Sequence, residues 1–408
     1  MVMACLVVAV GAFAYDYTDH VSVAANGKGD LLIFPVYFAL GGQYPISTEF
    51  KIINTSKTHS AVAKVVVRSF IYSQELLDFM IYLSPADMWI GRLEYGPNGP
   101  RMVSTDKSSP IVPMSQSLVA VTCTTVDTKT DKAADSNQMG YVEVIEAWAS
   151  DKKLVTNDHT KEIKGNYDAT SAIKYPAGTT IDMLSGSYEI VSPTLGWQAE
   201  DNALVMKSYD NDKYLNSSVE TLIGADARNT IQEVETALNK EDVAMAYNNS
   251  TATGGSIHVF TFPTKLSNSR ACTRISTSNS AFFPVDGHVK YSKNVYDSEE
   301  TSVTNIFSPS PTAPDMIDEV QFLSVPADFD FGWVLYNFSH GITTGVMKTA
   351  TLPNTISYNG TPVIPTIIDF KDGLAIRTAS WTDGTVTDST GTIIPNYQYS
   401  SKVVTTTP

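Results

Sequence analysis

Charged side chains are scarce in this chain of 408 residues, of which only 17% are Asp, Glu, Lys or Arg. The 28 Lys and Arg residues are outnumbered by 43 Asp and Glu, so the formal net charge is −15. No run of Lys and Arg occurs, and affinity for nucleic acid depends on clustered cations, so a nucleic-acid partner is not expected. The hydrophobic content of 43% excludes a mostly disordered chain.

The sequence also lacks an apolar run long enough to span a membrane. Its longest run, residues 1–14, would form a helix of about 21 Å, shorter than the roughly 30 Å hydrocarbon core of a bilayer. An A-x-A motif at Ala12–Ala14 precedes polar Tyr15, which predicts a signal peptide over 1–14. No basic residue precedes this run, which leaves open a start upstream of Met1 or a buried N-terminal strand or helix. We expect an exported protein, extracellular or on the cell surface, without a transmembrane segment once the signal is removed.

Cysteine is rare, with three residues in the whole chain. Removal of the signal peptide would leave Cys123 and Cys272 in an oxidising compartment, where two thiols commonly form one bridge. We therefore predict a Cys123–Cys272 disulfide, and the alternative is two thiols buried in separate cores. Neither cysteine has the spacing of a zinc site.

Alternation of apolar and polar residues dominates the first third of the chain. It is clear at 49–52, 61–70 and 77–83, with Lys64 and Arg68 on one face of the middle segment. Turn-forming residues separate these runs, which is typical of antiparallel sandwiches. Proline at position 35 predicts an edge or a bulge in the strand over 31–37, and Trp89 is an expected core residue. The predicted class is mainly β, with Ig-like or jelly-roll-type antiparallel sandwiches.

One helix is expected in the second half. Thr230 and Glu233 have the spacing of a capping box, and Ile231, Val234 and Leu238 share one face, so a helix is predicted over 230–247. Strand patterns return at 257–262, 322–325, 331–338 and 362–370.

The expected organisation has six parts. It comprises a signal peptide (1–14), an N-terminal extended segment (15–28), a β-sandwich domain (29–148), an elaborated insertion with the helix (149–255), a second β-sheet region that stands alone or completes the first domain (256–381), and a polar, mobile or partner-dependent C-terminal tail (382–408).

Several blocks of the sequence carry a family resemblance. The blocks are GDLLIFPVY at 29–37, INTS at 53–56, ELLDF at 75–79, LSPADMW at 83–89 and FTFPTK at 260–265. With these blocks the chain resembles an uncharacterised family of exported proteobacterial proteins often described as cell-surface proteins. The resemblance implies an exported surface protein of a Gram-negative-type bacterium, with a β-sandwich build, and it implies no particular activity.

Signatures of catalysis are absent from the sequence. The six histidines are too dispersed for an HExxH site, and no nucleophile elbow, P-loop or GxGxxG follows a strand. His258 lies in an alternating strand, where we expect it to face solvent. We therefore expect no catalytic residues and no enzyme, although side chains that meet only in space would not be detected in this way.

Calcium is the one cofactor that the sequence suggests. Asp210 and Asp212, and Asp328 and Asp330, place oxygen ligands at short spacing, as hard cations require, but neither pair completes an EF-hand loop. The alternative is a pair of solvated acidic turns.

The function expected from these features is that of an exported structural protein, a self-assembling subunit of an extracellular filament or surface layer. Copies would join by β-strand addition, in which an extended segment of one subunit completes a sheet of the next. The candidate donors lie near the two termini: Tyr15, Tyr17, Val21 and Val23, and Tyr397, Tyr399 and Val403. The alternative is a surface adhesin or a carbohydrate- or calcium-binding module with surface glycans as partners, and a secreted hydrolase is the less favoured third reading.

Overall fold

The protein is described by a computed structural model. It describes residues 21–71, 73–110, 115–118, 136–150, 182–208, 228–249, 255–265, 283, 289–297, 302–307, 315–325, 330–338, 343–346, 355–370, 375–378, 381–383, 386–388 and 393–394. Within these residues the fold is mainly β and antiparallel, with one short helix, which confirms the predicted class.

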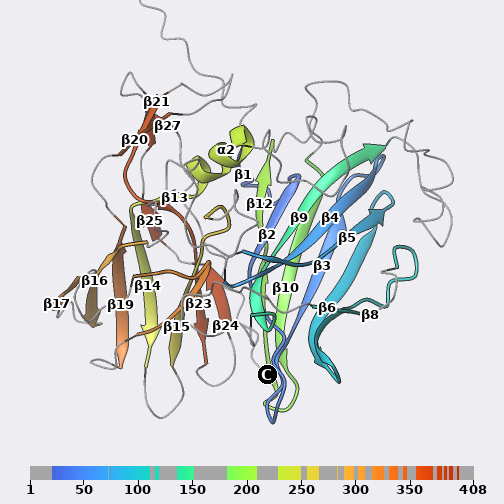
Figure 1. The fold of residues 1–408 in the computed structure, drawn as a ribbon, viewed down its shortest axis with the longest axis horizontal. Helices are drawn as coiled ribbons and strands as arrows, with labels where there is room; N and C mark the ends of the chain where they lie inside the picture. The colour runs from blue at the N-terminus through green and yellow to red at the C-terminus, as the bar shows by residue number, and fades with distance from the viewer. Residues whose placement is uncertain are drawn as a thin grey trace, which may run out of the picture.

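Two six-stranded sheets form the first sandwich (Figure 1). Sheet 1 has the order β11 (Trp197–Asn202), β10 (Leu184–Ser192), β3 (Ser47–Asn54), β6 (Met88–Gly96), β7 (Gly99–Val103) and β8 (Ser115–Ser117). Sheet 2 has the order β1 (Ser22–Val23), β12 (Leu204–Lys207), β2 (Leu31–Phe38), β9 (Met139–Ser150), β4 (Ser60–Ser69) and β5 (Glu75–Leu83).

Two further sheets form the second sandwich. Sheet 3 has the order β18 (Val320–Ser324), β15 (Ser256–Thr261), β23 (Ile364–Asp369) and β24 (Ala375–Thr378). Sheet 4 has the order β17 (Ser302–Phe307), β16 (Ser292–Asp297), β19 (Phe331–Asn337), β14 (Asp242–Asn248) and β25 (Trp381–Asp383).

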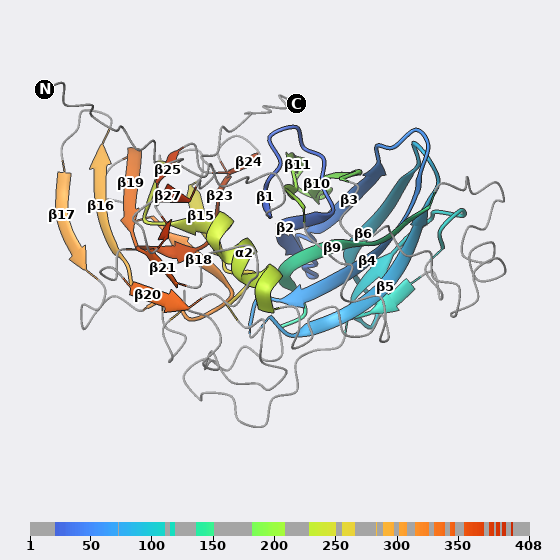
Figure 2. The same ribbon diagram turned by 90° about the horizontal axis from the view of Figure 1, so that it is seen from above.

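Smaller elements complete the described fold. A short pair joins β13 (Asn239–Lys240) to β22 (Thr361–Pro362), and a small sheet contains β20 (Thr343–Val346), β21 (Thr355–Tyr358), β26 (Val386–Asp388) and β27 (Ile393–Ile394). The helix α2 spans Arg228–Leu238 and lies beside β1, between the two sandwiches (Figures 1 and 2).

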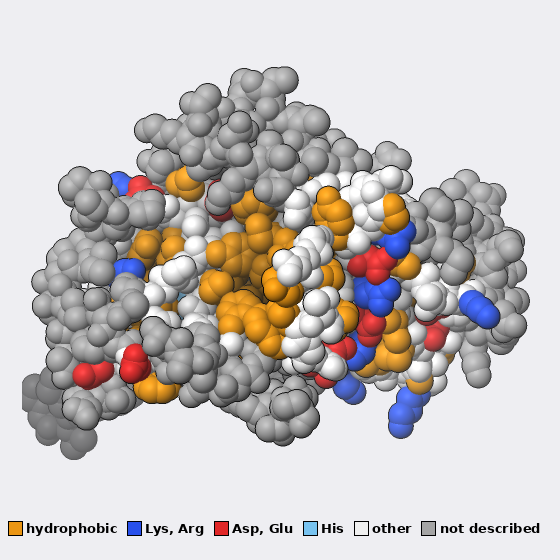
Figure 3. All heavy atoms as spheres, turned by 90° about the horizontal axis from the view of Figure 1, so that it is seen from below, with side chains coloured by type: hydrophobic (Ala, Val, Ile, Leu, Met, Phe, Trp, Pro, Cys, Tyr) orange, Lys and Arg blue, Asp and Glu red, His pale blue; other side chains and the backbone are white. Residues whose placement is uncertain are grey.

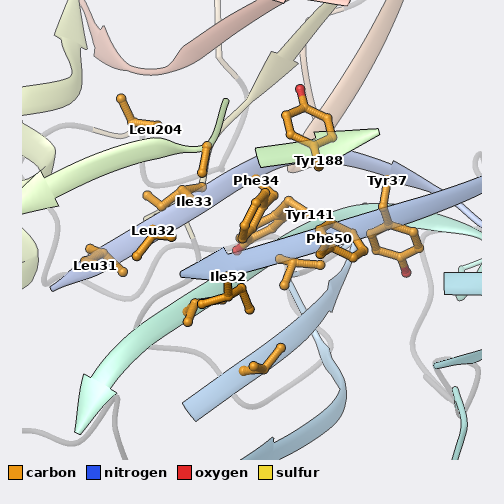
Figure 4. Packing of buried hydrophobic residues seen from close by; sticks show 14 of the residues in the cluster. Leu31, Leu32, Ile33, Phe34, Tyr37, Phe50, Ile52, Tyr141, Tyr188 and Leu204 are labelled. Carbon is orange, nitrogen blue, oxygen red and sulfur yellow. The ribbon is translucent and has the colours of Figure 1, made fainter. Parts of the chain in front are cut away.

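Aromatic side chains fill the core of the first sandwich (Figure 4). The ring of Phe34 packs edge-on against Phe50 at 5.1 Å and against Tyr188 at 5.9 Å, which joins sheet 2 to sheet 1. Such edge-to-face pairs add to the burial of the rings themselves. Trp89 is fully buried, as its apolar context predicted.

Sheet 3 joins the two sandwiches, because it is buried on both of its faces. Alternate residues of β15 belong to different cores: Val259 joins the core of the first sandwich, and Phe260 joins the core between sheets 3 and 4. The first core therefore continues across the junction into β23, through Ile364 and Ile368. The two sandwiches form one body rather than two domains on a linker.

A bulge, rather than an edge, explains Pro35. β2 is an internal strand with β12 on one side and β9 on the other, and its pairing with β9 shifts register between Phe34 and Tyr37. Proline cannot donate a ladder hydrogen bond, so it occupies the position that the bulge frees. The carbonyl oxygen of Pro35 accepts a hydrogen bond from Thr261 Oγ1 of sheet 3 at 2.6 Å.

The expected helix over 230–247 is wrong in its second half. The helix ends at Leu238, and residues 242–248 form β14, in which Val243, Met245 and Tyr247 alternate into the second core. β14 pairs with β19 on one side and β25 on the other. These non-local pairings override the local preference for helix, a common outcome where tertiary contacts compete with propensity.

The domain boundaries also differ from those expected. The described part of 149–255 supplies β10, β11 and β12 to the first sandwich, where β10 pairs with β3 and β12 pairs with β2. The same range supplies β14 to the second sandwich. In the expected polar tail, residues 381–383, 386–388 and 393–394 form β25, β26 and β27.

Candidate functional site

The first described residues form a short strand at the edge of sheet 2. Ser22 pairs with Lys207 and Val23 with Met206, and these are the only two register pairs of β1. The backbone N–H of Ala24 donates to the carbonyl oxygen of Val205 at 2.8 Å. β1 is thus an added edge strand on β12, and we call the surface that receives Val21–Ala24 the β1 slot.

Helix α2 forms the second wall of the β1 slot. The backbone N–H of Val21 donates to Glu233 Oε2 at 3.1 Å. Val234 and Leu238 of the same helix belong to the core that also contains Val21 and Val23. A carboxylate that accepts a backbone N–H makes a charge-assisted hydrogen bond, which is stronger than a neutral one. The slot therefore holds the strand by its backbone at both ends.

Burial of apolar side chains further stabilises the strand in the β1 slot. Val21 and Val23 are two positions apart and so lie on one face of the strand, and both are buried together with Ala24. The register places Val23 beside Met206, which is itself opposite Leu31 of β2. Burying a valine side chain contributes about 1.5 to 3 kcal/mol, so the two valines supply a few kcal/mol of docking energy.

A solvent-facing turn connects this strand to the rest of the chain. Ala25, Asn26 and Lys28 are exposed, and Gly27 has a φ of 67°, a left-handed conformation that glycine adopts without strain. The turn is closed by the N–H of Gly27 on the carbonyl oxygen of Ala24 and by the N–H of Lys28 on Asn26 Oδ1. Directly after the turn the chain is fixed again, because the N–H of Gly29 donates to the carbonyl oxygen of Leu184 and the N–H of Asp30 to that of Met206.

The contact of sheet 3 with sheets 1 and 2, which we call the seam, is built differently. Arg68 Nε donates to Glu143 Oε2 at 2.6 Å, and both side chains are almost fully buried. Burial opposes the charge on Arg68, but Glu143 and neighbouring groups outweigh that cost and raise the pKa of the guanidinium. This pair lies on the outer face of sheet 2, which the second sandwich covers.

Further buried polar groups lie beside this pair, and a hydrogen bond from Tyr141 to Pro263 crosses the seam. The hydroxyl of Tyr141 hydrogen-bonds with Ser73 Oγ at 2.8 Å and with the carbonyl oxygen of Pro263 at 3.2 Å. Burial raises the pKa of Tyr141, and the Glu143 carboxylate adds to that shift. Lys265 Nζ lies 3.6 Å from Glu319 Oε1, with both side chains buried.

Aromatic pairs also cross the seam near one face of the molecule. Phe38 lies 5.8 Å from Phe322, and Trp197 lies 5.7 Å from Phe370, and all four side chains are partly exposed. Figure 3 shows hydrophobic side chains gathered in the middle of the lower face, with acidic and basic side chains to one side. The seam combines apolar packing with buried charge over a wide contact.

Most of the residues proposed from the sequence lie outside the described residues. These are Cys123 and Cys272 of the expected disulfide, Asp210, Asp212 and Asp328 of the expected calcium turns, and Tyr15, Tyr17, Tyr397, Tyr399 and Val403 of the expected donors. Val21 and Val23 are described, and they occupy the chain's own sheet. Asp330 is exposed, and its carbonyl oxygen accepts the N–H of Asn249 at 2.7 Å.

No group of three or more His, Cys, Asp or Glu side chains suited to a metal ion occurs among the described residues. No helix within that part of the chain is long and apolar enough to span a membrane.

His258 is fully buried, so the expectation that it faces solvent is wrong. Its strand has two buried faces, and the imidazole points into the second core, where Nδ1 lies 2.8 Å from the Tyr336 hydroxyl and Nε2 lies 3.0 Å from the carbonyl oxygen of Ala246. A carbonyl oxygen can only accept, so Nε2 carries a proton and donates it to Ala246. The ring is a hydrogen-bonded core residue.

Glu233 was missed as a functional residue by the sequence reading, which assigned it to a capping box. The helix begins at Arg228, before Thr230, and the carboxylate of Glu233 binds the distant backbone of Val21 instead. The seam residues were missed too, because a charged residue in an alternating strand gives no sign that a second sandwich will cover it.

Comparison with known proteins does not assign a family. No family model and no curated protein matches the chain. Two solved structures of a lectin from Pleurotus ostreatus, one in its apo form and one in complex with GalNAc, match at 8% identity and a TM-score of 0.16. The match covers 95% of this chain and 94% and 95% of the two lectin chains. A similarity at this level supports no inference about function.

Proposed function

We propose that the chain is an exported structural protein of the cell surface, without catalytic activity, that assembles with copies of itself by β-strand addition. The observation that carries this proposal is the β1 strand. Val21 and Val23, two of the candidate donor residues, lie in or beside β1, a short strand at the edge of sheet 2, which supports the proposal. Strand addition uses this geometry, with backbone pairing for affinity and alternate side chains in pockets.

The construction of the rest of the molecule fits a load-bearing role. A continuous core joins the sandwiches, and hydrogen bonds from Thr261 to Pro35 and from Tyr141 to Pro263 cross the seam between them. A subunit of a filament or layer needs a rigid body of this kind, because a force applied at one edge must reach the other edge without hinge motion inside the subunit.

The test is direct observation of the purified mature chain. We expect negative-stain electron microscopy to show filaments or sheets whose amount rises with protein concentration, and the mature chain isolated from cells to begin near Tyr15. A matched chain that lacks residues 15–25 should stay monomeric. A full mature chain that remains a monodisperse monomer at high concentration would contradict the proposal.

The alternative is a surface adhesin or a module that binds carbohydrate or calcium. It predicts saturable binding of a glycan, or thermal stabilisation by calcium that is lost in Asp210→Ala and Asp328→Ala variants. A secreted hydrolase would instead turn over a substrate, and loss of that turnover in variants of single nucleophilic residues would identify it.

A further inference from the structure

We propose that the β1 slot of one copy receives Val21–Ala24 of the next copy, so that assembly is an exchange of the strand that each isolated copy holds for itself. This inference rests on the proposed function and specifies its interface. The partner is a second copy of the chain, and the surface is the edge of β12 together with Glu233 of α2.

The first support is that every described contact of the segment, apart from the turn, is with residues far along the chain. Val21–Ala24 is held by Val205, Met206, Lys207 and Glu233. A strand from another copy can make all of these contacts without change, which is the condition for domain swapping.

The second support is the turn at Ala25–Lys28, which would act as the hinge. Three of its four residues are exposed, and its two closing hydrogen bonds are local and open to replacement by water. Gly27 can leave its left-handed conformation without a steric penalty. When the turn extends, the segment leaves its own slot. Once it docks in the slot of another copy, only the hydrogen bonds of the turn have been lost.

The third support is the anchoring role of Glu233. The carboxylate binds the backbone N–H of Val21, so it marks where the incoming strand must stop along β12. The register of Ser22 opposite Lys207 follows from that position. A one-residue slip would move Val21 and Val23 to the opposite face, away from the apolar side of the slot.

The exchange propagates if each copy donates to one neighbour and accepts from another. The donor segment and the slot are different surfaces, so the contact is head-to-tail, and such contacts build open chains unless a rotation closes them. The slot lies beside α2 at the end of sheet 2 that β12 and β1 form (Figure 2).

The experiment uses a cysteine pair at opposing positions, Ser22→Cys with Lys207→Cys, in the full mature chain. Both side chains are only half-buried, so the substitutions leave the core intact. Assembled protein is oxidised and run on a non-reducing gel, with the two single-cysteine variants as controls for the native cysteines. We expect a ladder of covalent multimers that reductant collapses to monomer and that neither control shows.

The outcomes separate the exchange from the proposed function. Filaments with only intramolecular 22–207 cross-links would overturn the exchange. The proposed function would then require strand addition at another site. Cross-linked dimers without higher multimers would overturn the head-to-tail chain. No assembly, with intramolecular cross-links alone, would overturn both. If the first pair prevents folding, Val23→Cys with Met206→Cys tests the neighbouring register pair in the same way.

Discussion

The seam and the β1 slot both join elements that are distant in sequence, but they differ in extent and in chemistry. The seam uses sheet faces, a shared core and charges buried in pairs, such as Arg68 with Glu143. The β1 slot holds its strand with two register pairs, two buried valines and the carboxylate of Glu233, and an exposed turn connects that strand to the rest of the chain. Removing one partner of a buried pair leaves an uncompensated charge, whereas an edge strand can be replaced by an equivalent strand. We therefore expect the contacts of the seam to persist while the strand in the β1 slot exchanges between copies.

The largest effect is expected at the seam. Arg68→Leu leaves the Glu143 carboxylate buried without its partner, so we expect a loss of about 3 to 5 kcal/mol in the free energy of unfolding. Urea denaturation measures it. The matched control is Lys51→Ala in the partly exposed ion network of sheet 1, with an expected change within about 0.5 kcal/mol. Equal effects at the two sites would contradict the assignment of the seam as the permanent contact.

The second prediction concerns the valines of the slot. Val21→Ala with Val23→Ala removes about 3 kcal/mol of apolar burial in total, at about 0.8 kcal/mol per buried methylene. We expect filaments to be lost while the body stays folded. Hydrogen exchange should show faster exchange at Ala24 with unchanged protection in β2, because local opening is separate from global unfolding. A drop in protection throughout β2 would show that the slot is part of the permanent core.

The third prediction is alkaline destabilisation of the body. Burial raises the pKa of Tyr37, Tyr141 and Tyr336, so these hydroxyls stay protonated in the folded state and ionise more readily when the chain unfolds. Stability is therefore fully present below the unfolded pKa of about 10 and falls as pH rises, by up to about 1.4 kcal/mol per pH unit for each tyrosine.

The control for this titration is a matched pair of substitutions. Tyr141→Phe should make the slope between pH 10 and 12 shallower, whereas Tyr44→Phe, at a side chain that is 51% exposed, should leave it unchanged. Thermal unfolding followed at several pH values measures the slope. An identical slope in all three proteins would contradict the role of the buried hydroxyl.

The smallest effect is expected at Glu233. Glu233→Ala removes the acceptor of the Val21 N–H, and a hydrogen bond to a charged group contributes about 1.5 to 3 kcal/mol. We expect filaments to form only at a higher protein concentration and to lose subunits faster. Glu233→Gln keeps an oxygen acceptor and should lie between Ala and the original chain. If Ala and Gln behave alike, the charge rather than the hydrogen bond would be responsible.

The fold class and strands such as β2 to β5, β15 and β19 were predictable because alternation is a local property of the sequence. Trp89 and the strands around it follow from the apolar period alone. The end of the helix was not predictable, because β14 is fixed by β19 and β25, which lie more than 80 residues further along the chain. Local propensity cannot report pairings of that kind.

Burial of polar residues was the other feature that the sequence concealed. His258 and Arg68 lie in strands whose alternation looks half-exposed, yet each strand is covered on both faces by a sheet from elsewhere in the chain. At the candidate site, the strand Ser22–Val23 falls within the N-terminal segment that the sequence singles out, whereas the surface that holds this strand could not be predicted. It requires β12 and α2 to be brought together by the fold.

The most direct test of the account is an isotope-mixing experiment on the Ser22→Cys, Lys207→Cys chain. Equal amounts of ¹⁴N- and ¹⁵N-labelled protein are disassembled, mixed, assembled and oxidised, and the peptides that contain the 22–207 disulfide are weighed by mass spectrometry. Exchange between copies predicts that about half of these peptides join one light and one heavy strand. Peptides that are only light–light or heavy–heavy, recovered from intact filaments, would show that each copy keeps its own strand and would contradict the account.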